Sequence, residues 1–132
     1  MVRKVFVARG ALQPSVEVGG TCNAERTFLF VRDAADGIVR ATEAYNHSDP
    51  VNLGSGNEVT VRNLAEAIAK LCRFTGDLRW DASRPDGQPR RCLDTTRARD
   101  QFGFSATTSL ESGLQETIAW WEGQRQQIPC AA

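Results

Sequence analysis

An apolar stripe in residues 60–72 constrains the fold of this chain more than any other feature. The apolar side chains recur at intervals of three and four residues, and they are Val61, Leu64, Ala65, Ile68, Leu71 and Cys72. This spacing predicts an amphipathic helix with a continuous apolar face. Thr60 is a typical N-cap residue, and Gly76 lies just beyond the expected end of the helix. Because such a face must be covered by a second layer, the stripe predicts a packed core.

Shorter segments on both sides of this helix alternate between strand and helix. Runs of β-branched and aromatic residues predict buried strands at residues 27–31, 51–53 and 77–80. Apolar spacing and capping residues predict further helices at residues 33–45, 94–103 and 109–124. In the first of these helices, capped by Asp33, the residues at helical spacing are Ala35, Ile38, Val39, Thr42 and Tyr45. Residues 4–9, KVFVAR, suit a strand or a helix equally.

This order predicts an α/β fold, a small domain of short strands and about four helices. The intervening helices act as crossovers, so neighbouring strands are expected to be parallel. We expect residues 1–124 to form a single domain and residues 125–132 to be a disordered tail. Parallel sheets usually contain more strands than these, so the architecture looks incomplete.

The charge balance excludes several classes of function. Sixteen basic and sixteen acidic side chains cancel, so no broad electrostatic surface for nucleic acid or an anionic membrane is expected. No apolar run approaches the length of a membrane span, and the N-terminus lacks the features of a signal peptide. We therefore expect a cytoplasmic protein that binds neither nucleic acid nor membrane.

The cysteines and the single histidine argue against a metal site. The four cysteines are widely spaced, at Cys22, Cys72, Cys92 and Cys130, and none forms a C-x-x-C pair. His47 is the one histidine and lies in a turn-like segment. Free thiols and no zinc are therefore expected.

A cationic loop at residues 83–94, SRPDGQPRRCLD, contains the most specific candidate site. Proline and glycine predict a tight turn that presents Arg84, Arg90 and Arg91. A guanidinium group can donate two parallel hydrogen bonds to the oxygens of one phosphate, so one interpretation of the loop is a phosphate-binding site. The other is a solvated loop whose arginines pair with Asp81, Asp86 and Asp94. The glycines of NLGSG, residues 52–56, are a weaker phosphate signal, since a dinucleotide fingerprint needs a third glycine.

Catalytic residues are not evident in the sequence. It has no Ser/His/Asp set, and Tyr45 has no lysine four residues later. Arg26 precedes the first predicted strand, where an arginine can face a ligand. One arginine alone is weak evidence, and the residues by themselves show no catalytic constellation.

Four segments together resemble a known family. In chain order they are ERTFLFVRDAADGIVRATEAY, VNLGSGNEVTVRNLAEAIAKL, LRWDASRPDGQPRRCLDTTRARDQFGF and SLESGLQETIAWW. They are similar to the C-terminal portion of NAD(P)-dependent sugar-nucleotide epimerases/dehydratases, the extended short-chain dehydrogenase/reductases. The nearest branch is GDP-L-fucose synthase, in which D-x-S-x-P-D-G-x-P-R and N-x-G-x-G-x-E-x-T-I-R runs are typical. The resemblance covers residues 2–124.

The resemblance implies a substrate-binding portion without its Rossmann half. Family members carry the NAD(P) site and a Ser/Tyr-x-x-x-Lys set in that half, so this chain is expected to bind no cofactor and to be inactive alone. The family's basic residues hold the diphosphate of a nucleotide sugar, which assigns substrate binding to Arg26, Arg90 and Arg91. Arg91 stands where fucose synthases usually have lysine. Thr27 and Phe30 also depart from the usual residues.

Three hypotheses follow from this resemblance. The chain is a stand-alone module that binds a nucleotide diphosphate sugar, or half of a split enzyme completed by a separate Rossmann chain, or a repurposed interaction protein. Loss of the Rossmann contact would expose a strand edge and an apolar patch, so a homo-oligomer, most simply a twofold dimer, is also expected.

Overall fold

The structure describes residues 1–127, which contain five helices and five short strands. In this computed structural model the order is α1 (Val2–Gly10), β1 (Ser15–Gly19), β2 (Glu25–Thr27), α2 (Val31–Ala44), β3 (Glu58–Thr60), α3 (Val61–Leu71), β4 (Asp77–Asp81), β5 (Arg90–Arg91), α4 (Thr96–Phe102) and α5 (Leu110–Gln127). The predicted α/β class is confirmed. None of these helices combines the length and the apolarity that crossing a membrane requires.

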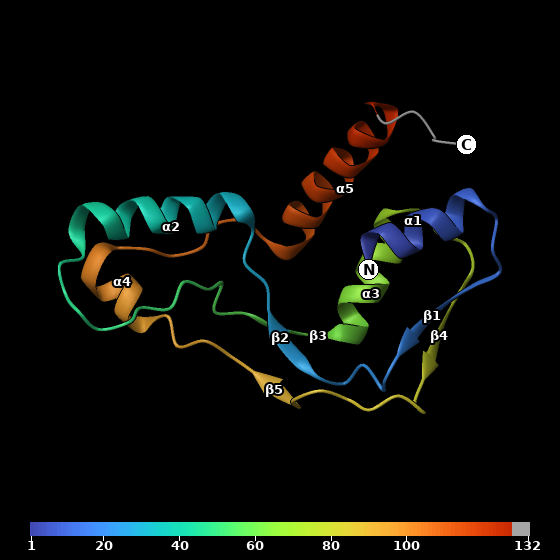
Figure 1. Cartoon of the computed structure of the whole chain (residues 1–132), viewed down its shortest axis with the longest axis horizontal. Coiled ribbons are helices and arrows are strands. Elements are labelled where there is room, and N and C mark those ends of the chain that lie inside the picture. Colours follow the sequence, from blue (N-terminus) through green and yellow to red (C-terminus); the bar gives the residue numbers. More distant parts are fainter. Residues whose placement is uncertain (128–132) are drawn as a thin grey trace.

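The strands form two small sheets. β1 pairs with β4 in parallel, while β2 lies between β3, which is antiparallel to it, and β5, which is parallel to it. Figure 1 shows β1 and β4 near α1 and α3 at one end of the molecule, α2 and α4 at the other, and the second sheet between them. The expected parallel pairing is found for β1–β4 and β2–β5, which are not consecutive in the chain. It is wrong for β2 and β3, which helix α2 connects and which are antiparallel.

The main core lies where the β1–β4 sheet meets α1, α3 and α5. Its buried members include Val5, Val16, Ile68 and Ile118. The predicted helix at residues 60–72 is confirmed as α3, and the Thr60 hydroxyl accepts a hydrogen bond of 3.0 Å from the Asn63 N–H. This N-cap satisfies one of the free donors of the first turn.

The ambiguous N-terminal segment is helix α1. Val5 and Ala8 are three residues apart, which is a helical spacing, and both are buried, as is Phe6. Because α1 covers β1 and α3, tertiary packing selects the helix where local preference was balanced.

Of the three predicted strands, the one at residues 51–53 is not a strand in the structure, and the one at residues 27–31 keeps only Thr27, the last residue of β2. Residues 28–30 and 51–53 belong to no ladder, although the prediction at residues 77–80 is confirmed by β4. A strand needs a neighbour for its backbone N–H and C=O groups, and within residues 1–127 no strand lies beside either segment. In contrast, Ser15–Gly19 was not predicted and forms β1, because β4 lies next to it.

Helix α2 buries a different face from the one that its apolar spacing suggested. Asp33 and Gly37 are its buried residues, whereas Ile38 and Val39 are 59% and 54% exposed. The ring of Phe104 lies so close to Gly37 that a Cβ there would be 2.8 Å away. Asp33 is inside the helix and is not its N-cap: it accepts hydrogen bonds from the Thr107 hydroxyl at 3.2 Å and the Thr108 N–H at 3.0 Å.

The C-terminal helices follow the prediction closely. Asp94 accepts a hydrogen bond of 2.9 Å from the Thr96 N–H at the start of α4, and Gly103 ends that helix with a φ of 64°. α5 continues to Gln127, three residues past the predicted end at residue 124. The rest of the predicted tail, residues 128–132, lies outside the described residues.

Candidate functional site

Two of the three predicted site arginines lie side by side. In the parallel pair formed by β2 and β5, Arg26 faces Arg91. A hollow of about 300 Å³ opens beside them, lined by Arg26, Thr27, Phe28, Arg91 and Leu93. The structure therefore brings together residues that are 65 positions apart in the sequence.

Strand alternation explains why Arg26 and Arg91 share one face of the sheet. Successive side chains of a strand point to opposite faces, and Arg26 is paired with Arg91 across the ladder. Phe28 and Leu93, just beyond the ends of β2 and β5, also line the hollow. The same rule places Arg90 on the opposite face, where its partner across the ladder is Glu25. The structure thus separates Arg90 from the other two.

Arg90 is already paired with a carboxylate. Its Nε and Nη2 donate hydrogen bonds of 2.8 and 2.7 Å to the two carboxylate oxygens of Glu58, and Glu25 lies 3.9 Å away. The hydrogen bonds from Arg90 hold the pKa of Glu58 below its usual value. The side chain of Arg90 is 65% exposed, so this fork orders the sheet more than it adds to stability.

Apart from Arg91, the other charges of the cationic loop are also engaged by neighbouring residues. Arg84 donates to Asp81 at 2.9 Å and lies 3.6 Å from Glu17. The predicted pairing of loop arginines with Asp81 is therefore found for Arg84. Asp86 and Asp94 instead accept hydrogen bonds from Thr21 and Thr96.

Arg26 and Arg91 are different, since neither forms a salt bridge with any residue of the described part. Arg26 Nη1 donates a hydrogen bond of 2.7 Å to its neighbouring carbonyl oxygen, Glu25 O. Like charges that face each other across a ladder repel, and an anion between them would remove that repulsion. Two guanidinium groups beside an aliphatic and an aromatic side chain suit a phosphate with an apolar group attached.

A turn and the cationic loop are fastened together near these arginines. The Thr21 N–H and hydroxyl donate hydrogen bonds of 2.8 and 2.6 Å to the two carboxylate oxygens of Asp86. These bonds hold the pKa of Asp86 below its usual value. Gly20 has a φ of 88°, and a Cβ there would be 2.5 Å from the Asp86 carboxylate, so the turn requires glycine at this position.

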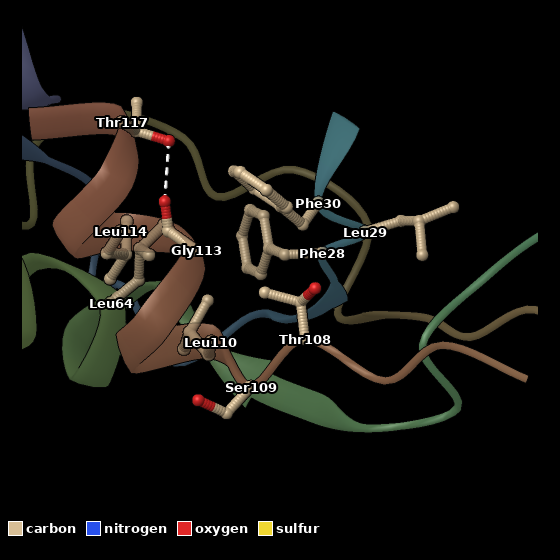
Figure 2. A pocket seen from close by; sticks show the side chains of 10 residues that line it. All are labelled: Phe28, Leu29, Phe30, Leu64, Thr108, Ser109, Leu110, Gly113, Leu114 and Thr117. Carbon is tan, nitrogen blue, oxygen red and sulfur yellow. Dashed lines mark hydrogen bonds between the residues drawn. The ribbon is translucent and has the colours of Figure 1, made fainter. Parts of the chain in front are cut away.

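An apolar groove lies between residues 28–31 and helix α5. In Figure 2 the rings of Phe28 and Phe30 face α5, whereas Leu29 points away from it. Phe30 lies so close to Gly113 that a Cβ there would be 3.0 Å from its ring. The groove of about 180 Å³ is lined mainly by apolar side chains, Leu64, Leu110 and Leu114 among them. A second hollow, lined by Val31 and Trp120, adjoins it through Phe30 and Thr117.

Other reactive groups are dispersed or buried. No group of three metal-ligating side chains occurs among the residues that the structure describes. Cys22, Cys72 and Cys92 are free thiols, and burial raises the pKa of Cys22 and of Cys72, which makes both poor nucleophiles. Cys130 lies outside the described residues. The Tyr45 hydroxyl donates a hydrogen bond of 3.0 Å to the Asp49 carbonyl.

Sequence reasoning missed three residues of this region. Phe28 and Leu93 line the hollow, and Glu58 neutralises Arg90. The first two lie just beyond the ends of β2 and β5, so their place in the hollow depends on the pairing of these strands and not on a local pattern. The role of Glu58 depends on the pairing of β3 with β2, which no local pattern indicated.

The chain is similar to GDP-L-fucose synthases over most of its length. It is 36% identical over 121 residues to probable GDP-L-fucose synthase 1 of Oryza sativa subsp. japonica, and 37% identical over 121 residues to GDP-L-fucose synthase 1 of Arabidopsis thaliana. Each match covers 92% of this chain, and the chain spans 37% of the length of each relative. No family model matches the chain. The matched region is the C-terminal part of extended short-chain dehydrogenase/reductases, which confirms the predicted resemblance.

Solved structures contain the same fold. A GDP-L-fucose synthetase from Naegleria fowleri bound to NADP superposes with a TM-score of 0.89, covering 96% of this chain and 40% of that chain. The sequence identity of this pair is 22%, so the superposition supports the fold alone.

Proposed function

We propose that this chain, which matches the C-terminal part of an extended short-chain dehydrogenase/reductase, binds the diphosphate of a nucleotide sugar between Arg26 and Arg91. The proposal assigns to the chain substrate binding without hydride transfer. These residues bind no nicotinamide cofactor in this proposal. The chain is also proposed to be cytoplasmic. Arg90 has a supporting role through Glu58.

The observation that carries the proposal is the parallel register of β2 and β5. It sets two guanidinium groups opposite each other on one face, without a salt-bridge partner in the described part, and places the neutralised Arg90 on the other face. Diphosphate oxygens accept such paired hydrogen bonds, and Phe28 and Leu93 offer an apolar surface beside them. The names of the relatives, GDP-L-fucose synthases, support a nucleotide sugar as the ligand class.

The expected affinity is modest. Two charge-assisted bidentate contacts contribute about 3 kcal/mol together, and a shallow hollow adds little apolar burial. A dissociation constant in roughly the millimolar range follows.

Calorimetric titration with a GDP-sugar, a UDP-sugar and NADPH tests the proposal. We expect heat with a nucleotide sugar and none with NADPH. Arg26→Ala and Arg91→Ala should each weaken binding about tenfold, which corresponds to the loss of one charge-assisted contact. Arg79→Ala, which removes an exposed arginine of β4, should leave it unchanged. Absence of heat at millimolar nucleotide sugar contradicts the proposal. Tight binding of NADPH contradicts the statement that these residues bind no nicotinamide cofactor.

A second candidate function is that of a substrate-binding half that docks on a Rossmann-type domain. An exposed outer face is made by Val31, Ile38 and Val39 of α2, at 73%, 59% and 54% exposure, together with Trp120 of α5, at 61% exposure, which lines a hollow with Val31. Soluble proteins rarely expose such groups together without a partner. Residues 28–30 and 51–53 belong to no ladder, so their backbone groups suit pairing with strands of that domain.

Titration with the N-terminal domain of the Arabidopsis thaliana relative tests this second function. Ile38→Asp should abolish binding because it places a charge in the outer face, while Thr75→Asp, an exposed position outside that face, should not. Light scattering of the chain alone is the companion measurement. A dimer that Ile38→Asp dissociates would assign the outer face to a second copy and contradict the Rossmann assignment.

A further inference from the structure

Two connections run together between the sheets. Residues 20–24 lead from β1 to β2, and residues 82–89 lead from β4 to β5. Because β1 is parallel to β4 and β2 is parallel to β5, both connections leave one sheet and enter the other in the same direction. In Figure 1 they form the blue and the yellow traces between the sheets.

The register changes between the two sheets. In the first sheet Gly19 faces Asp81, 62 positions later, whereas in the second sheet Glu25 faces Arg90, 65 positions later. The second connection therefore has three more residues than the first. A turn at residues 82–84 accommodates them, with the Arg84 N–H donating to Asp81 O at 3.2 Å.

The Thr21–Asp86 link lies after this turn. Its two residues are separated by the same number of positions as the paired residues of the second sheet. Thr21 and Asp86 are 65 positions apart, the same separation as Glu25 and Arg90 and as Arg26 and Arg91. Both carboxylate oxygens of Asp86 are engaged, one by the Thr21 N–H and the other by the Thr21 hydroxyl. The Glu25 N–H then donates to Pro89 O at 2.9 Å, which begins the ladder.

We infer that Asp86 is a positioning residue for the arginine pair, because its bonds to Thr21 set the register in which Arg91 faces Arg26. β5 is only two residues long, so its own ladder holds that register weakly. A slip of one residue would reverse the faces, bringing Arg90 beside Arg26 and turning Arg91 away. The inference rests on the proposed function for its ligand, a nucleoside diphosphate, and not for its geometry.

The Asp86→Ala variant distinguishes a role of Asp86 in setting the register from a purely electrostatic effect of its charge. Loss of a negative charge near a cationic site should by itself strengthen the binding of an anion. If Asp86 sets the register, Asp86→Ala should instead weaken GDP binding about tenfold, because neither Arg91 nor Arg90 is then held in a fixed place opposite Arg26. Glu17→Ala is the matched control, since it removes a carboxylate beside Arg84 without touching Thr21, and it should not weaken binding.

A double-variant cycle tests whether Asp86 acts through Arg91. With GDP as the probe, Asp86→Ala should cost about tenfold in the natural background and almost nothing in the Arg91→Ala background. Thr21→Val, which keeps the side-chain shape and removes one donor, should give a smaller loss of the same kind. Equal losses in both backgrounds, or tighter GDP binding by Asp86→Ala, would overturn the inference.

A ligand-free measurement keeps this inference separate from the proposed function. The Arg90 Nε–H is hydrogen-bonded to Glu58, so its NMR resonance and exchange rate report the face that Arg90 occupies. Asp86→Ala should move that resonance toward the position of a solvated arginine and speed its exchange, while Glu17→Ala should not. If the natural chain fails to bind GDP and this shift is still seen, the proposed function fails and the register role stands. An unchanged Arg90 signal overturns the register role.

Discussion

Arg90 and Arg91 are consecutive in sequence and lie on opposite faces of the β3–β2–β5 sheet. Arg90 forks onto Glu58, with hydrogen bonds of 2.8 and 2.7 Å, and Arg91 faces Arg26 beside a shallow hollow. Strand alternation thus divides one basic dipeptide into a structural cation and a candidate ligand cation.

Conservative replacement of Arg91 should separate charge from geometry. Arg91→Lys keeps the positive charge and loses the planar fork, so nucleotide-sugar binding should weaken less than in Arg91→Ala, by about threefold against about tenfold. Calorimetry measures both variants. Equal affinity in Arg91→Ala and the natural chain would remove Arg91 from the site.

Truncation of the α3 face should destabilise the fold far more than loss of a site arginine. Ile68 is 2% exposed and belongs to the main core, so Ile68→Ala should lower the free energy of unfolding by about 2–5 kcal/mol. Exposed Arg91→Ala should change it by less than about 0.5 kcal/mol. Urea denaturation followed by circular dichroism gives both values, and similar losses would mean that the core is misassigned.

A methyl group at Gly37 should disrupt the contact between α2 and Phe104. A Cβ there would be 2.8 Å from the Phe104 ring and 3.1 Å from Leu53, so Gly37→Ala should cost about 1–3 kcal/mol of stability through overpacking. Gly123→Ala is the control, because a Cβ at that helical position meets nothing within 4 Å. It should raise stability by up to about 1 kcal/mol. Thermal unfolding distinguishes the two, and an equally stable Gly37→Ala variant would contradict the packing of α2.

The Glu58–Arg90 fork should make stability depend on acidity. Hydrogen bonds from Arg90 lower the folded-state pKa of Glu58 below its usual value of 4.5. The contribution is therefore present at neutral pH and above the unfolded-state value, and it is lost as the pH falls through the lowered folded-state pKa. Unfolding temperatures measured from neutral to acidic pH should fall less steeply in Glu58→Gln than in the natural chain. Parallel curves for the two proteins would show that the fork does not contribute.

Local pattern was enough for the elements whose stability comes from their own residues. The spacing of Val61, Leu64 and Ile68 predicted α3, and Thr60 and Gly103 marked helix ends that the structure confirms. Helix hydrogen bonds close within the segment, and caps act within one turn, so such features are readable from neighbouring residues. The family resemblance was also evident from the sequence, through the order of its motifs.

Tertiary structure alone decided the sheets and the site. Residues 28–30 and 51–53 have the composition of strands, yet strand formation requires a neighbouring strand, and no strand of residues 1–127 pairs with them. The sequence by itself identified three candidate arginines, whereas the ladder register decided that Arg26 faces Arg91 and that Arg90 turns to Glu58. Register joins residues 65 positions apart, and a shift of one position reverses every face. No property of the segments taken singly determines it, because the hydrogen bonds that set it connect separate parts of the chain.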